Sequence, residues 1–94
     1  MIVRWTALAA EHLEAVHQYL AAEDAETADR LIERILAGVE MLVPYPDLGR
    51  KGRLSGTREL VTTGTPYLVS YRVHRDEVQI LAVLHGARRW PERF

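Results

Sequence analysis

The chain has 94 residues and a mass of 10.7 kDa, and with 48% hydrophobic and 27% charged residues it is predicted to form one folded domain rather than a disordered segment. It contains no cysteine, which excludes disulfide bridges and thiolate chemistry and fits a reducing, cytoplasmic location. Its longest uncharged run, 60–71, is too short to cross a bilayer and its start lacks the features of a signal peptide, so we expect neither membrane insertion nor secretion.

The net charge of −1 conceals an uneven distribution of charge along the chain. Residues 1–49 carry three basic and nine acidic side chains, whereas residues 50–94 carry nine basic and four acidic ones. This division indicates a basic face for an anionic partner, although ordinary sorting of surface charge between helices and strands gives the same counts.

The first half of the sequence predicts a short strand followed by two helices. Residues 2–5 have the composition of a strand. Apolar residues then recur at helical spacing over 7–22, where Thr6 is a suitable N-cap, and over 28–42, where Asp24 is the cap. Two prolines end the second helix soon afterwards. The short link between the helices predicts an antiparallel hairpin.

The second half predicts a loop followed by three strands. Residues 47–57 are basic and rich in glycine, without apolar periodicity, and are expected to form a loop. The strands are expected over 58–63, 67–74 and 77–85, antiparallel because short turns join them. The expected fold is therefore α+β, in the order β-α-α-β-β-β, a single domain over 1–94 with the hairpin covering one face of an antiparallel sheet.

Alternation along the last strand assigns its side chains to two faces. Strict alternation over 77–85 groups Val83 with His85 on one face and Ile80 with Ala82 on the other. His85 then ends a strand just ahead of two arginines. In that position it is either an acid–base group or a structural histidine bonded to a neighbouring loop.

Most small-molecule chemistry lacks a supporting motif in this sequence. The spacing of His12 and His17 does not place both rings on one helical face, so no metal site is expected. The loop at 47–57 lacks the Gly-Lys-Ser/Thr sequence of a phosphate-binding P-loop, and no serine lies in a nucleophile elbow. We expect no cofactor.

The basic residues of the second half are the candidates for binding a target or a nucleic acid. Arginine forks match phosphates, and an aromatic ring can stack on bases. The alternative is that these charges only solvate an apolar sheet. The candidates are Arg50, Lys51, Arg53, Arg72, Arg88, Arg89 and the aromatic Trp90.

Several sequence runs, in their order and spacing, resemble the RelE/ParE superfamily, the toxins of bacterial type II toxin–antitoxin systems. The runs are PDLGR at 46–50, GTREL at 56–60, YLVSYRV at 67–73 and ILAVLHGAR at 80–88, so that the resemblance covers nearly the whole chain. It implies a growth-inhibiting toxin, neutralised in a hetero-oligomer by an antitoxin encoded next to it.

The resemblance implies two alternative targets. RelE-like members cut messenger RNA on the ribosome, and here Arg58 and His85 match positions that such nucleases use for catalysis. However, Leu68 stands where RelE-like members carry an arginine, and leucine cannot stabilise a charged phosphate. ParE-like members lack the nuclease residues and poison DNA gyrase, so the missing arginine favours this target. A third interpretation is a relative that binds its partner but has lost toxicity.

The apolar stripes of the two helices are the predicted antitoxin-binding surface. A disordered antitoxin segment is expected to fold as a helix across the groove between them, while its tail covers the basic face. The stripe residues expected to make these contacts are Leu13, Val16, Leu20, Ile32, Ile35 and Val39.

Overall fold

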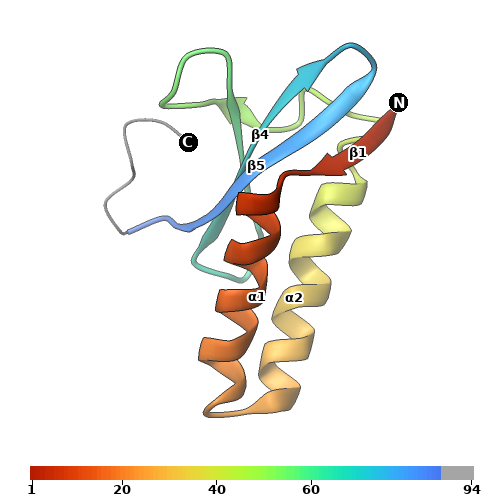
Figure 1. The fold of residues 1–94 in the computed structure, drawn as a ribbon. Helices are drawn as coiled ribbons and strands as arrows, with labels where there is room; N and C mark the ends of the chain where they lie inside the picture. The colour runs from red at the N-terminus through yellow and green to blue at the C-terminus, as the bar shows by residue number, and fades with distance from the viewer. Residues whose placement is uncertain (88–94) are drawn as a thin grey trace.

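The computed structural model describes residues 1–87 as a helical hairpin packed on a five-stranded sheet (Figure 1). The elements in chain order are β1 (Ile2–Trp5), α1 (Ala7–Ala21), α2 (Ala25–Glu40), β2 (Arg50–Lys51), β3 (Arg58–Val61), β4 (Tyr67–His74) and β5 (Glu77–His85). The strands are arranged in the order β1-β5-β4-β3-β2. The α+β class and the helical hairpin predicted from the sequence are confirmed.

Both helices begin at the predicted caps. The Thr6 hydroxyl accepts a hydrogen bond from the Ala9 amide at 3.2 Å, and it also donates to the carbonyl of Ile80 at 2.9 Å, which ties the start of α1 to β5. The Asp24 carboxylate accepts from the first amides of α2. The pKa of Asp24 is held below its ordinary value mainly by the hydrogen bond that its carboxylate accepts from the Thr27 hydroxyl, and next by the one it accepts from the Thr27 amide.

The sheet is mixed rather than wholly antiparallel. β1 pairs in parallel with β5, from Ile2 opposite Glu77 to Trp5 opposite Ile80. Only strands joined by a short turn have to run antiparallel, and the helical hairpin with three strands separates β1 from β5 in the chain. The sequence pattern carries no information about this long-range pairing.

The segment 47–57, expected to be a loop, contains the short edge strand β2. Arg50 and Lys51 pair with Glu59 and Arg58 of β3, and the hairpin is closed by the Gly52 amide, which donates to the Thr57 carbonyl at 2.8 Å. Two residues are too few to show a period in the sequence. The prediction of a continuous loop is therefore wrong at residues 50–51.

A bulge in β5 changes the predicted faces. The register with β4 shifts by one residue between the pairs Ser70–Ala82 and Tyr71–Ile80, which leaves one extra residue in β5. Val83 therefore lies on the same side as Ile80, toward the helices, and both are buried in the core. Strict alternation, which separates these two residues, is corrected by the bulge.

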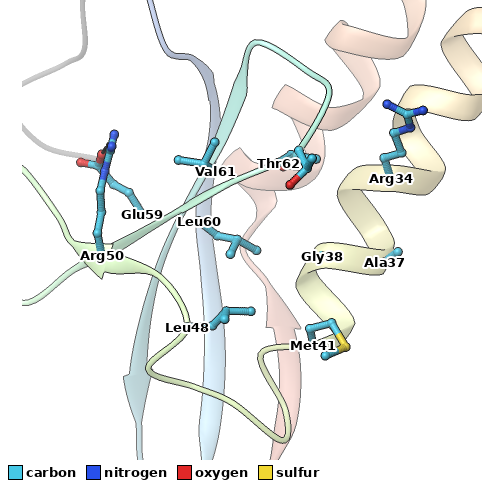
Figure 2. A pocket seen from close by; sticks show the side chains of 11 residues that line it. Arg34, Ala37, Gly38, Met41, Leu48, Arg50, Glu59, Leu60, Val61 and Thr62 are labelled. Atoms are coloured by element: carbon cyan, nitrogen blue, oxygen red, sulfur yellow. Dashed lines mark hydrogen bonds and ion pairs between the residues drawn. The ribbon is translucent and has the colours of Figure 1, made fainter.

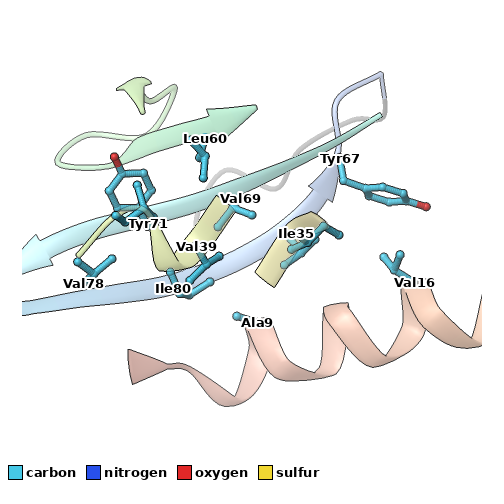
Figure 3. Close-up of a cluster of buried hydrophobic side chains, with 12 residues drawn as sticks. Ala9, Val16, Ile35, Val39, Leu60, Tyr67, Val69, Tyr71, Val78 and Ile80 are labelled. Carbon is cyan, nitrogen blue, oxygen red and sulfur yellow. The ribbon is translucent and has the colours of Figure 1, made fainter. Parts of the chain in front are cut away.

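The core lies between the hairpin and one face of the sheet (Figure 3). Its fully buried side chains come from both layers and include Ile35 of α2 and Val69, Tyr71 and Ile80 of the central strands. Burying each such side chain contributes about 1.5–3 kcal/mol, so the two layers stabilise one another. Within residues 1–87, neither helix has the length and apolar character needed to span a lipid bilayer.

The turn between β4 and β5 offers a stabilising substitution. Arg75 and Asp76 have φ angles of 49° and 61°, in the left-handed region that favours asparagine and glycine. We expect Arg75→Asn combined with Asp76→Gly to stabilise the protein by about 1 kcal/mol, because both positions lose strain. Thermal denaturation followed by circular dichroism should show a rise in Tm of about 4–8 °C. An unchanged Tm would contradict this interpretation of the turn.

His12 joins α1 to the edge of β5 that β1 leaves uncovered. Its Nδ1 atom accepts a hydrogen bond from the Val83 amide at 3.2 Å, and this contact requires a neutral ring. Partial burial lowers the pKa of His12, while the charge of Glu11 acts in the opposite direction.

The stability of the protein should therefore depend on pH through the pKa shift of His12 on folding. Because its pKa is lower in the folded chain, the unfolded chain binds the proton more readily, and the free energy of unfolding should fall as pH drops below about 6.5. We expect this fall to be smaller in His12→Gln, whose side-chain oxygen can accept from the same amide without titrating. Urea unfolding at a series of pH values measures both proteins. Parallel pH profiles would contradict the role given to His12.

Candidate functional site

A groove of about 800 Å³ runs between α2 and the edge of the sheet (Figure 2). Ala37, Gly38 and Met41 line its helix side, and Leu60 and Val61 line its strand side. The absence of a side chain at Gly38 brings the two sides together, since a Cβ there would lie 3.3 Å from Leu60 Cδ2. The groove is thus a consequence of small residues on the face of α2 that meets β3.

Strand β3 is covered only in part at this edge. β2 pairs with residues 58 and 59 and then ends. The Thr62 amide donates to the Tyr67 carbonyl at 3.2 Å on the β4 side, so alternation directs the backbone N–H and C=O of Val61 toward the open edge. The Val61 side chain is 52% exposed. An extended peptide can add to such an edge as a further strand.

The face of the sheet away from the helices carries part of the predicted basic set. Arg50 Nη2 lies 3.2 Å and Arg53 Nε 3.5 Å from the carboxylate of Glu59, which also accepts from the Arg53 amide at 2.8 Å. The Glu59 side chain is 2% exposed, whereas those of Arg50 and Arg53 are 58% and 46% exposed. A buried carboxylate therefore fixes two arginines that still face solvent.

Arg72 and Arg4 extend this basic face across the sheet. Arg72 Nε donates to Gln79 at 2.6 Å, Gln79 donates to Glu77 at 3.0 Å, and Glu77 forms an ion pair with Arg4 at 2.8 Å. Hydrogen bonds from Gln79 and then Arg4 lower the pKa of Glu77. Arg4 is absent from the predicted site, because only the parallel register of β1 with β5 places it near Arg72.

Arg58 and Lys51 lie on the other side of the edge strands. They are opposite one another in the register, and Tyr71, which faces Arg58 from β4, belongs to the core. Arg58 Nη1 donates to the Gly49 carbonyl at 2.9 Å, and Nη2 lies 3.7 Å from the Asp47 carboxylate. The Arg58 guanidinium thus holds the connection between α2 and β2, and the predicted basic set is divided between two faces.

The two residues predicted for a nuclease, Arg58 and His85, are not brought together. His85 pairs with Tyr67 and Arg58 pairs with Tyr71, on strands that flank β4 on either side. With about 3.3 Å per residue and about 4.8 Å per strand, their Cα atoms are about 16 Å apart. The His85 ring packs edge-on against Tyr67 with 5.5 Å between centroids, and its Nδ1 accepts from the Ala87 amide. These contacts are those of a structural histidine.

The helix residues predicted to bind an antitoxin lie in or against the core of the chain itself. Three of them are buried under the sheet and three pack beside these. In so short a chain the apolar stripe of each helix is the only face that can cover the sheet, so it is occupied before any partner arrives. The prediction is corrected for the buried Val16, Ile35 and Val39, whereas Leu13, Leu20 and Ile32 keep part of their surface exposed and their contact with an antitoxin stays a prediction.

Three of the exposed apolar side chains line the groove. Met41, Leu48 and Val61 are 46%, 52% and 52% exposed. In the sequence these are apolar residues that belong to neither helical stripe. Their role in the groove becomes apparent only when the structure shows β3 as an open edge of the sheet. The remaining predicted target-binding residues, Arg88, Arg89 and Trp90, lie outside the described residues.

Three comparisons agree with this architecture. Residues 3–90 match the family model described as "ParE toxin of type II toxin-antitoxin system, parDE". The chain is 41% identical over 90 residues to "Putative toxin Y4kP" of Sinorhizobium fredii (strain NBRC 101917 / NGR234), covering 96% of this chain and 93% of that protein. It is also similar to a chain of the solved structure "Chromosomal ParDE TA system from P. aeruginosa", with a TM-score of 0.80 and 29% identity over 88% of this chain and 92% of the other.

The family match spans nearly the whole chain, and it includes the groove and both faces of the sheet. The similarity to the solved structure is one of fold as well as of sequence. The chain therefore belongs to the ParE toxin family of type II toxin–antitoxin systems.

Proposed function

We propose that an antitoxin neutralises this toxin by adding an extended segment to the open edge of β3 and filling the groove along α2. The observation that carries the proposal is the backbone of Val61, which no described strand pairs on the open edge, beside the exposed apolar side chains of Met41 and Leu48. Main-chain hydrogen bonds at the edge would supply affinity, and the groove would select side chains.

The proposed target of the free toxin is DNA gyrase, reached in the cytoplasm through the basic face of the sheet. Arg50 and Arg53 present half-exposed guanidinium groups, which suit carboxylates and phosphates on a large anionic partner. Two features support gyrase over messenger RNA cleavage: Arg58 and His85 stand apart, and Leu68 stands where nuclease relatives carry an arginine.

Expression of the toxin without an antitoxin in bacteria tests this target. We expect filamentation and induction of the DNA-damage response, and purified gyrase should accumulate cleaved DNA in the presence of the toxin. A halt of translation with cut transcripts would contradict gyrase as the target in favour of the nuclease alternative. Normal growth would contradict toxicity altogether.

Two substitutions sharpen the same experiment. His85→Gln should retain toxicity, because the contacts of the His85 ring among residues 1–87 are to the Tyr67 ring and the Ala87 amide, which are structural. Arg50→Gln combined with Arg72→Gln should reduce toxicity, since both side chains lie on the basic face and reach solvent, and glutamine removes each charge without placing a second carboxylate beside the buried Glu59. If His85→Gln abolished toxicity while the double variant kept it, the nuclease alternative would be favoured over gyrase.

A further inference from the structure

Two arginines of α2, Arg34 and Arg30, lie toward one end of the groove, and the charge of Arg30 also acts on Asp24 at the start of the helix. In the part of the chain that the structure describes, neither Arg30 nor Arg34 forms an ion pair. Arg34 makes no hydrogen bond there either, and Arg30 makes one weak contact of 3.4 Å with the Thr27 hydroxyl, which already donates to Asp24. Both guanidinium groups therefore keep nearly all of their donors available.

Their location links them to the groove. Arg34 lines it on the same side of α2 as Ala37 and Met41 (Figure 2). The guanidinium lies over the turn after β3, where Gly64 has a φ of +79° and where a Cβ would collide with Arg34 Nη1. Arg34 also lines a second, smaller hollow of about 290 Å³, together with Arg30 and Thr65. Arg34 thus stands between the groove, which Met41 lines, and the hollow that Arg30 lines, so that the two follow one another along α2.

The charge of this end contrasts with its surroundings. Residues 1–49 contain nine acidic side chains and only three basic ones, and two of the three are Arg30 and Arg34. Four residues apart, they lie on one side of α2 one turn from each other. A carboxylate that enters the groove there can accept paired N–H bonds from a planar guanidinium, which a lysine could not match.

We propose that Arg34, with Arg30 beside it, binds an acidic side chain of the antitoxin segment that occupies the groove, and so sets its orientation and register. This inference rests on the proposed role of the groove. Arg34 and Arg30 are about 10 Å and 16 Å from Met41 along the helix axis, which an extended chain covers in about three to five residues. The segment therefore carries an apolar side chain at the Met41 end and an aspartate or glutamate three to five positions away.

The test measures binding of the antitoxin encoded next to this gene by isothermal titration calorimetry. Arg34→Glu should weaken binding by about 10- to 100-fold, and Arg34→Lys by less. Changing the matching acidic residue of the antitoxin to arginine should restore binding to Arg34→Glu. The matched control is Arg75→Glu, the same change of charge on the turn at the far end of β4, which should bind like the unmodified toxin. Circular dichroism establishes that each variant is folded.

A second variant separates this inference from the proposed role of the groove. Met41→Asp places a charge at the apolar end, where the side chain is 46% exposed and its replacement leaves the core intact. If Met41→Asp weakens binding while Arg34→Glu and Arg75→Glu bind alike, the groove binds the antitoxin, but the proposal that Arg34 binds an acidic side chain is wrong. If neither Met41→Asp nor Arg34→Glu weakens binding, the proposed role of the groove fails as well.

Discussion

Replacing Gly49 with alanine should destabilise the protein by about 2–4 kcal/mol, because the site has no room for a methyl group. A Cβ at Gly49 would lie 2.6 Å from Tyr71 Cε1, 2.7 Å from Tyr71 Oη and 2.9 Å from the Glu59 carbonyl. The Tyr71 hydroxyl accepts from the Gly49 amide at 2.8 Å and donates to the Pro46 carbonyl at 2.7 Å. Alanine displaces the ring and breaks both hydrogen bonds, which fasten the connection between α2 and β2.

Two further variants separate crowding from hydrogen bonding. Tyr71→Phe keeps the ring but leaves the Gly49 amide and the Pro46 carbonyl without the hydroxyl, at a cost of about 1–3 kcal/mol. Gly86→Ala is the matched control, since its Cβ would meet only ordinary contacts of 3.4–3.6 Å. Urea unfolding measures all three. A Gly49→Ala protein as stable as Gly86→Ala would show that the connection is not held in this way.

The elements that could be predicted are those whose signals are local. Thr6 and Asp24 cap the two helices because their side chains bond to amides within three residues. The strands from β3 to β5 follow from alternation and short turns, although β3 ends at Val61, two residues before the predicted end. The order of these elements follows from the same local signals, and the resemblance to a toxin superfamily agrees with it.

The features that escaped prediction depend on pairing between distant parts of the chain. The two-residue strand β2 has no period, the parallel partner of β1 is 75 residues away, and the bulge in β5 is visible only against β4. The site depends on the first two. Arg4 joins Arg72 through the parallel register, and the groove exists because β2 stops before Val61.

The burial of the helical stripes follows from residue type, whereas that of Glu59 does not. The stripes cover the sheet as the predicted hairpin requires, so their buried residues Val16, Ile35 and Val39 are not available to a partner. No sequence pattern indicates that Glu59, a charged residue in a predicted strand, is buried, yet its side chain is 2% exposed. Its burial becomes favourable only through partners that β2 and the loop after it supply.

Glu59→Ala should therefore affect both stability and toxicity. The change leaves the Arg53 amide without its acceptor and opens a cavity under the loop after β2, for a loss of about 2–4 kcal/mol. The arginines themselves add little to this loss, because half-exposed guanidinium groups regain water when the carboxylate is removed. Chemical denaturation measures the loss. The control is Glu77→Ala, whose ion pair with Arg4 lies at the surface and should contribute much less.

The isosteric variant Glu59→Gln distinguishes a structural role from one in the basic face. Its amide oxygen can still accept from the Arg53 amide, so most of the stability should remain, but the neutral side chain no longer holds Arg50 and Arg53 by charge. If the basic face contacts the target, toxicity should fall in Glu59→Gln at a temperature where the protein stays folded. Because Arg50 and Arg53 keep their charges and lose only the ion pair with Glu59, such a loss would mean that their placement, and not merely their charge, is what the target recognises.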